Sequence, residues 1–106
     1  MQQKKLGILL STAPSDPAVA VVPRLAQEAV RAGVDVYLYM IDEGVRNLGD
    51  PRYAELGESG VKVFVCAYGC QRHAVSTETV PRSMTLCGLV VLANMITGCD
   101  RFLAFN

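Results

Sequence analysis

A cysteine stands where a strand gives way to a helix, a place where sulfur can be reactive. Cys66 closes an apolar run over residues 61–66 that predicts a buried strand, and residues 69–75 favour a short helix. A thiol between a strand end and a helix start faces backbone N–H groups that stabilise a thiolate. Arg72 and His73 in the predicted helix bring positive charge toward the same sulfur. The sequence therefore predicts a reactive thiol, with burial as a small hydrophobic residue as the alternative.

The other cysteines and the histidine admit further roles. Cys70 could resolve an oxidised or persulfidated Cys66 through a disulfide, or it could pack under the short helix. Together with His73 these two cysteines offer three soft ligands, but their spacing is wider than that of usual zinc pairs, and we predict no metal site. Cys87 and Cys99 flank a later apolar helix, and we interpret them as packing residues.

A hydroxyl-rich loop follows the first apolar run. Ser11 and Thr12 stand where open α/β sheets can hold a phosphate group. The loop has two prolines and no glycine, and the chain carries no G-x-G-x-x-G or Walker motif, so we predict no nucleotide cofactor. We expect Ser11 and Thr12 to line the same pocket as Cys66.

Apolar runs alternate with helical patterns along the whole chain. Pro23 lies inside the first helical pattern and should kink that helix or delay its start, whereas Gly33 and Gly60 are expected to end helices. This alternation predicts βαβ units in one domain over residues 1–106: a small, doubly wound α/β fold with a mainly parallel five-stranded sheet and helices on both faces. The predicted strands are 6–10, 34–41, 61–66, 82–87 (the weakest) and 101–105, and the predicted helices are 17–32, 42–48, 51–58, 69–75 and 89–97.

Composition narrows the classes of function. Ten basic residues balance ten acidic ones and form no basic stripe, which disfavours nucleic-acid binding. The apolar stretch over residues 86–96 is shorter than the ~20 residues needed to span a bilayer, and the N-terminal apolar run is too short for a signal peptide. We expect a cytoplasmic protein with reduced thiols. Helix 89–97 is apolar nearly all round, so another subunit or the domain's own core should cover its outer side.

Several segments, taken in order, resemble the DsrE/DsrF-like family of sulfur-relay proteins, and the likeness covers nearly the whole chain. A third strand that ends in Cys66, followed by Arg72, is the segment that carries the chemistry. His73-Ala74 stands where the family often has a glycine after the arginine. The other matching segments are the first strand at residues 5–11, the strand that runs into the "DGV"-like residues 40–45, Gly88-Leu89, and the "ADRVLVF"-like ending at residues 99–105.

This resemblance implies a flavodoxin-like sheet and a homo- or hetero-oligomer, often a trimer or hexamer. It also implies that Cys66, the cysteine at the matching position, carries persulfide sulfur between proteins as a sulfurtransferase or sulfur carrier. The expected partners are further copies of the chain and other sulfur-relay proteins. The alternative is a non-catalytic oligomeric module of the same fold that binds a small molecule or a protein.

Overall fold

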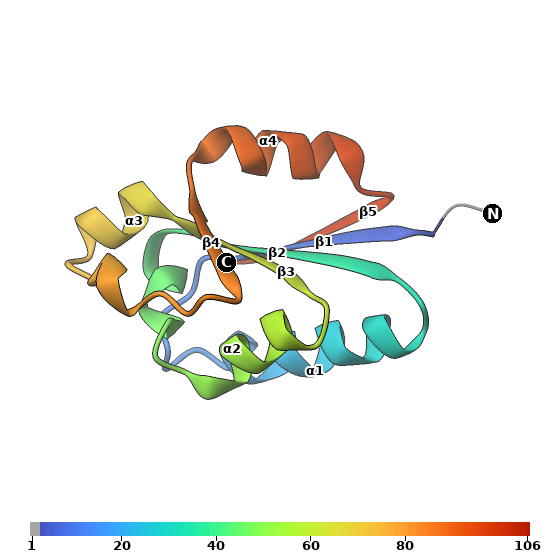
Figure 1. Cartoon of the computed structure of the whole chain (residues 1–106), viewed down its shortest axis with the longest axis horizontal. Coiled ribbons are helices and arrows are strands. Elements are labelled where there is room, and N and C mark those ends of the chain that lie inside the picture. The colour runs from blue at the N-terminus through green and yellow to red at the C-terminus, as the bar shows by residue number, and fades with distance from the viewer. Residues whose placement is uncertain (1–2) are drawn as a thin grey trace.

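The computed structural model describes residues 3–106, which form a single parallel sheet between two layers of helices (Figure 1). Its strands are β1 (Lys5–Leu10), β2 (Asp35–Met40), β3 (Lys62–Cys66), β4 (Met84–Cys87) and β5 (Arg101–Phe105). They lie in the order β4-β3-β2-β1-β5, and every neighbouring pair is parallel. The predicted α/β fold with five strands is confirmed, including the weak fourth strand, which is shorter than expected.

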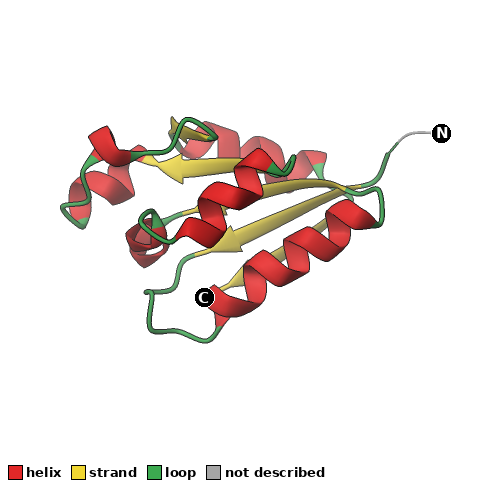
Figure 2. Ribbon diagram, turned by 60° about the horizontal axis from the view of Figure 1, so that its bottom comes forward, coloured by secondary structure: helices red, strands yellow, loops and turns green. Residues whose placement is uncertain are grey.

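The helices are divided unequally between the two faces. Figures 1 and 2 show α1 and α2 packed along one face, while α4 alone covers the other. Short helices α3 and η1 lie beyond the carboxyl ends of the strands. The helix bounds are α1 (Ala18–Arg31), η1 (Asp42–Asn47), α2 (Pro51–Glu58), α3 (Ala67–Arg72), η2 (Thr77–Thr79) and α4 (Leu89–Gly98).

The core lies between the sheet and the layer of α1 and α2. Side chains alternate along each strand, so one set faces this layer, and its members Ile8, Leu10, Leu38 and Met40 are fully buried. On the opposite face, Met95 is the only buried residue of α4. The α4 face is therefore thinly covered within one subunit. No helix of residues 3–106 combines the length and the apolar character needed to cross a membrane.

Helix α1 runs without interruption through Pro23 and begins at Ala18, so its start is not delayed. Proline has no N–H group and leaves the carbonyl four residues earlier without its helical partner. That carbonyl belongs to Val19, and the buried hydroxyl of Tyr53 in α2 donates to it at 2.9 Å. The partner supplied by α2 explains why the proline is tolerated, and it fixes α1 against α2.

Glycine ends α1 and α2 as predicted, whereas α3 ends differently. Gly33 and Gly60 have φ of 84° and 106°, in the left-handed region that glycine adopts without steric cost. The predicted helix at 69–75 instead begins at Ala67 and ends at Arg72. Ala74, with φ of 54°, takes the left-handed position there, and Val75 N–H donates to the Cys70 carbonyl at 2.8 Å. Because alanine rarely adopts this conformation, the sequence did not predict that the helix ends here.

Candidate functional site

Cys66 occupies the junction that the sequence predicted, as the last residue of β3 and the N-cap of α3. Its sulfur accepts a hydrogen bond from the Gly69 N–H at 3.4 Å. A Cβ on Gly69 would come within 3.1 Å of Val45 and 3.3 Å of the Asp42 nitrogen, so the glycine lets α3 pack closely on η1. The Cys66 side chain is 2% exposed. The sulfur is thus buried, but it has a backbone donor directed at it.

A pocket of about 400 Å³ opens beside this sulfur. Arg72 from α3 lines the pocket together with Cys66, so a permanently charged side chain borders the same cavity as this cysteine. A cation stabilises a thiolate or a persulfide anion. The walls come from the end of β2, from η1, from α3 and from the start of α4, and the lining residues are Ile41, Asp42, Cys66, Tyr68, Gly69, Arg72 and Leu89.

His73 lies near the pocket but is not among the residues that line it. Its Nε2 is 2.7 Å from Asp42 Oδ1, and its Nδ1 is 3.5 Å from Glu43 Oε1. The imidazole is therefore engaged by the two carboxylates that begin η1. The structure gives His73 a role in tying α3 to η1, and it does not bring the ring to the Cys66 sulfur.

Cys70 points into the interior on α3 and is fully buried. Burial raises the pKa of the Cys70 thiol, and the nearby charge of Cys66 raises it further. Because the thiolate is the nucleophile, both influences make Cys70 less reactive.

Two residues of this region had no predicted role at the site: Tyr39, and Cys87, which was interpreted as a packing residue. The Tyr39 side chain is fully buried, and its hydroxyl donates to the Gly88 carbonyl at 2.9 Å. Burial raises the pKa of Tyr39, and the nearby Cys66 and Cys87 thiols raise it further. Cys87 ends β4 directly beside Cys66 in the sheet register. The sequence predicted that both cysteines end parallel strands, but it did not show that these two strands are neighbours in the sheet.

Ser11 and Thr12 do not reach this pocket. The Ser11 hydroxyl donates to Asn106 Oδ1 at 3.0 Å at the end of β1, and Thr12 is buried with its carbonyl accepting from the Asn47 amide at 3.1 Å. The strand order accounts for this correction, because β2 separates β1 from β3, and Ser11 N–H donates to the Phe105 carbonyl at the end of β5.

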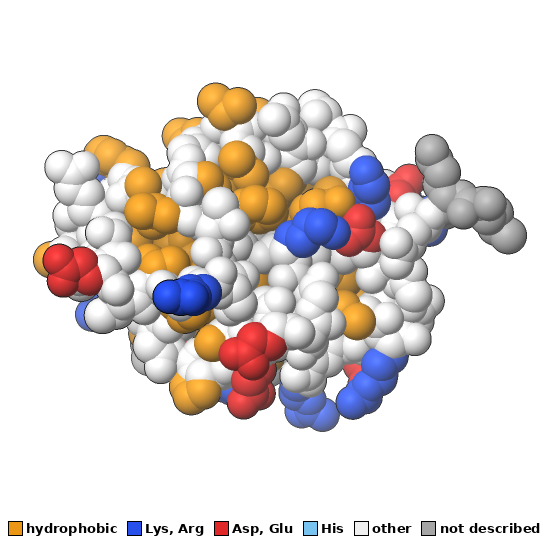
Figure 3. All heavy atoms as spheres, in the orientation of Figure 1, with side chains coloured by type: hydrophobic (Ala, Val, Ile, Leu, Met, Phe, Trp, Pro, Cys, Tyr) orange, Lys and Arg blue, Asp and Glu red, His pale blue; other side chains and the backbone are white. Residues whose placement is uncertain are grey.

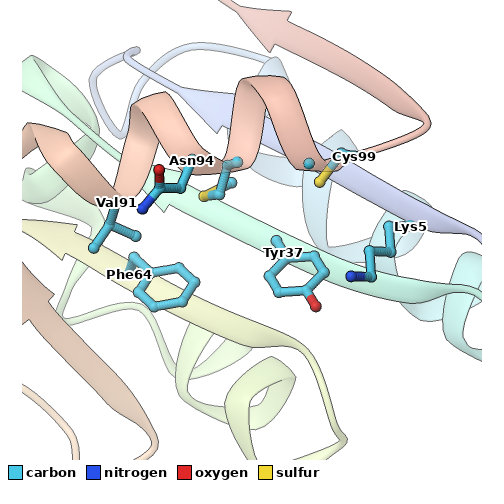
Figure 4. A pocket seen from close by; sticks show the side chains of 8 residues that line it. Lys5, Tyr37, Phe64, Val91, Asn94 and Cys99 are labelled. Carbon is cyan, nitrogen blue, oxygen red and sulfur yellow. The ribbon is translucent and has the colours of Figure 1, made fainter.

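A second cavity, of about 330 Å³, lies between α4 and the sheet (Figure 4). In Figure 4 the side chains of Val91 and Asn94 on α4 lie across from the Phe64 and Tyr37 rings on the strands, with Cys99 and Lys5 at the other end. Burial raises the pKa of the Cys99 thiol. Within residues 3–106, no three His, Cys, Asp or Glu side chains are grouped so that they could hold a metal ion.

Comparison with solved structures finds the same fold in proteins of very different sequence. The ychN protein from E. coli superimposes with a TM-score of 0.79 at 17% identity, covering 98% of this chain and 100% of that protein. A protein of unknown function from Methanobacterium thermoautotrophicum gives 0.75 at 12% identity, with 96% and 99% covered. One from Bacteroides thetaiotaomicron gives 0.75 at 18% identity, with 96% and 95% covered. At these identities the likeness shows the fold alone.

The family is identified by comparing the sequence with models of known protein families. No curated protein matches the chain. A model of the DsrE/DsrF-like family matches residues 4–105, which is nearly the full length. This match includes the strand-end cysteine and the pocket beside it, and it shows that the chain belongs to the DsrE/DsrF-like family.

Proposed function

We propose that this protein is a cytoplasmic sulfur carrier that accepts and donates persulfide sulfur on Cys66. The observation that carries the proposal is that Cys66 lines an open pocket together with Arg72, while the Gly69 N–H donates to the Cys66 sulfur. Family membership supports the same reading, because the family is related to sulfur relay.

The chemistry needs few groups. The Cys66 thiolate attacks the outer sulfur of a donor persulfide or polysulfide, the S–S bond of the donor breaks, and the donor thiolate leaves. The persulfide held on Cys66 then gives its outer sulfur to the thiolate of an acceptor by the same step in reverse. The pocket has room for a donor or acceptor group, and the Arg72 guanidinium favours the anionic sulfur species at each stage.

Mass mapping of the reduced protein after exposure to inorganic polysulfide tests this function. We expect a mass increase of one sulfur atom on the peptide that contains Cys66, removed by dithiothreitol. Cys99 provides an internal comparison because it lies in the other cavity, and its peptide should gain no sulfur. A Cys66 thiol that carries no added sulfur and is linked to no other cysteine, or an increase confined to Cys99, contradicts the proposal.

Small-molecule binding without sulfur chemistry is the second candidate, and the cavity under α4 favours it. Phe64, Tyr37 and Val91 give this cavity apolar walls, and Lys5 adds a cation. Its volume falls within the usual range of ligand pockets, about 300–1,000 Å³. The mass experiment separates the two candidates, since a binding module would leave Cys66 unmodified and slow to alkylate.

We also propose that the protein acts as an oligomer of identical subunits, a trimer or hexamer, that bury α4. This helix has no charged residue, and Leu89, Val90 and Ile96 on it are 57%, 75% and 52% exposed. Figure 3 shows hydrophobic side chains gathered over this side of the molecule. Apolar surface concentrated in this way marks an interaction site. The start of α4 also borders the Cys66 pocket through Leu89, so assembly would shape the entrance to the sulfur.

A charge placed on α4 should separate the subunits. We expect Val90→Glu to shift the mass measured by light scattering from oligomer to monomer, because burying a carboxylate in an apolar contact costs several kcal/mol. Val21→Glu is the matched control, since Val21 is 49% exposed on α1, on the opposite layer. Wild-type mass for Val90→Glu, or dissociation by the control alone, contradicts this assignment of the interface.

A further inference from the structure

Cys66 and Cys87 end neighbouring strands in register. β3 and β4 pair in parallel, and the two cysteines are direct partners in that pairing. Neighbouring strands lie about 4.8 Å apart, and residues in register on parallel strands project to the same face of the sheet. Disulfides form when the two Cα atoms are about 4.4–6.8 Å apart. The backbone therefore places the two thiols within bonding reach of each other.

Tyr39 lies on the next strand, β2, and ties it to the residue after Cys87. Its hydroxyl donates to the Gly88 carbonyl at 2.9 Å. Burial raises the pKa of Tyr39, and the adjacent thiols Cys66 and Cys87 add to the effect. The hydroxyl thus stays protonated and keeps its hydrogen bond to the Gly88 carbonyl.

Cys87 is better suited than Cys70 to react with Cys66. Burial and the charge of Cys66 raise the pKa of both Cys87 and Cys70, but the nearby Tyr39 hydroxyl and Val65 backbone oppose the rise at Cys87. Nothing comparable opposes it at Cys70. Cys87 is also partly exposed, whereas Cys70 is fully enclosed.

We propose that Cys87 is the resolving thiol of the Cys66 persulfide and converts the bound sulfur to sulfide. This step rests on the proposed function of Cys66. The Cys87 thiolate attacks the inner sulfur, Sγ of Cys66, while its proton goes to solvent. A Cys66–Cys87 disulfide forms, the bond to the outer sulfur breaks, and that sulfur leaves with the electron pair as hydrosulfide. In this step the Cys87 sulfur is oxidised and the outer sulfur is reduced, while Cys66 Sγ exchanges one S–S bond for another.

An external dithiol must then reduce the disulfide to restore both thiols. The geometry favours this second step. The Cβ atoms of a disulfide are about 3.8 Å apart, which is closer than the strand spacing, so a bond between adjacent strands is strained. Strained disulfides are the readily reduced ones. With a dithiol present, the protein releases sulfide repeatedly, whereas without one it stops after a single turnover per subunit.

The test measures sulfide release from protein that has been loaded with polysulfide. Loading and removal of the excess polysulfide are both carried out without oxygen. Wild-type protein should release about one sulfide per subunit and yield a peptide pair linked through Cys66 and Cys87 under non-reducing conditions. We expect Cys87→Ser to keep the persulfide on Cys66 at least about ten times longer, because the internal attacking thiolate is gone. Cys70→Ser and Cys99→Ser are the matched controls and should release sulfide like the wild type.

Two results overturn the proposal: release from Cys87→Ser at the wild-type rate, and a linked peptide that contains Cys70 in place of Cys87. The mapping in the wild-type protein needs no variant to fold. A second arm uses diamide, a dithiol oxidant, on the reduced protein and should link Cys66 to Cys87 without any bound sulfur. If Cys66 never takes up sulfur, the proposed function fails, and the diamide result then decides by itself whether the two thiols form a pair.

Discussion

Replacing Gly44 by alanine should strongly destabilise this domain. A Cβ at this position would lie 2.0 Å from the Leu10 carbonyl oxygen and 2.8 Å from its carbon, and both are backbone atoms that no rotamer change can move. Relief requires η1 to separate from the end of β1. We expect a loss of at least about 3 kcal/mol, and a melting temperature lower by roughly 15 °C in a domain of this size.

Gly49→Ala is the control for this measurement. Gly49 is exposed, and a Cβ there would meet no atom within 4 Å. We expect its unfolding free energy to change by no more than about 0.5 kcal/mol. Thermal unfolding followed by circular dichroism compares the two variants directly. A Gly44→Ala protein that melts within a few degrees of the wild type would show that β1 and η1 are not fixed against each other as described.

The close approach at Gly44 also matters for the candidate site. It sets the position of η1, whose Asp42 lines the Cys66 pocket and binds His73. Val45 of the same helix packs on Gly69, the residue that donates to the Cys66 sulfur. The sequence resemblance had singled out the segment around Gly44 only as a family-like pattern. The structure gives the reason, which is that two backbones meet there with no space for a side chain.

Local signals accounted for most of the fold. Short apolar runs predict strands covered on both sides, and Gly33 and Gly60 ended their helices because both positions need a left-handed backbone. Cys66 could be placed for the same reason, since a strand end and a helix start are each visible in the sequence. The end of α3 was missed because Ala74 adopts the conformation that glycine usually takes.

What the sequence could not supply was the lateral order of the strands. Ser11 follows β1 and Cys66 ends β3, and both were expected at one pocket, but β2 lies between these two strands. Cys87 was interpreted as a packing residue, yet the pairing of β4 with β3 sets it beside Cys66. Tyr39 joins them only because β2 is the other neighbour of β3. Each of these relations is a contact between distant segments, which no local pattern encodes.

Replacing Cys66 by serine should abolish sulfur transfer while leaving the fold intact. The sulfur now accepts from the Gly69 N–H as the N-cap of α3, and serine is among the preferred N-cap residues, so the hydroxyl can take over that bond. A hydroxyl does not form a persulfide, so the variant has no group that can hold the transferred sulfur. We expect the rate of transfer from polysulfide to an acceptor thiol to fall at least about 10³-fold, as when other enzymes lose their nucleophile.

Cys99→Ser is the matched control for this loss. It makes the same chemical change in the separate cavity under α4. We expect a transfer rate within about twofold of the wild type, because a substitution in that cavity leaves the surroundings of the Cys66 sulfur unchanged. Both variants should melt close to the wild-type temperature. Transfer that survives in Cys66→Ser, with the melting temperature unchanged, would assign the reaction to another thiol. If Cys66→Ser loses both transfer and folding, a third variant, Cys66→Ala, separates the two effects. Alanine has no capping group, so the melting temperature of Cys66→Ala measures how much stability the cap contributes.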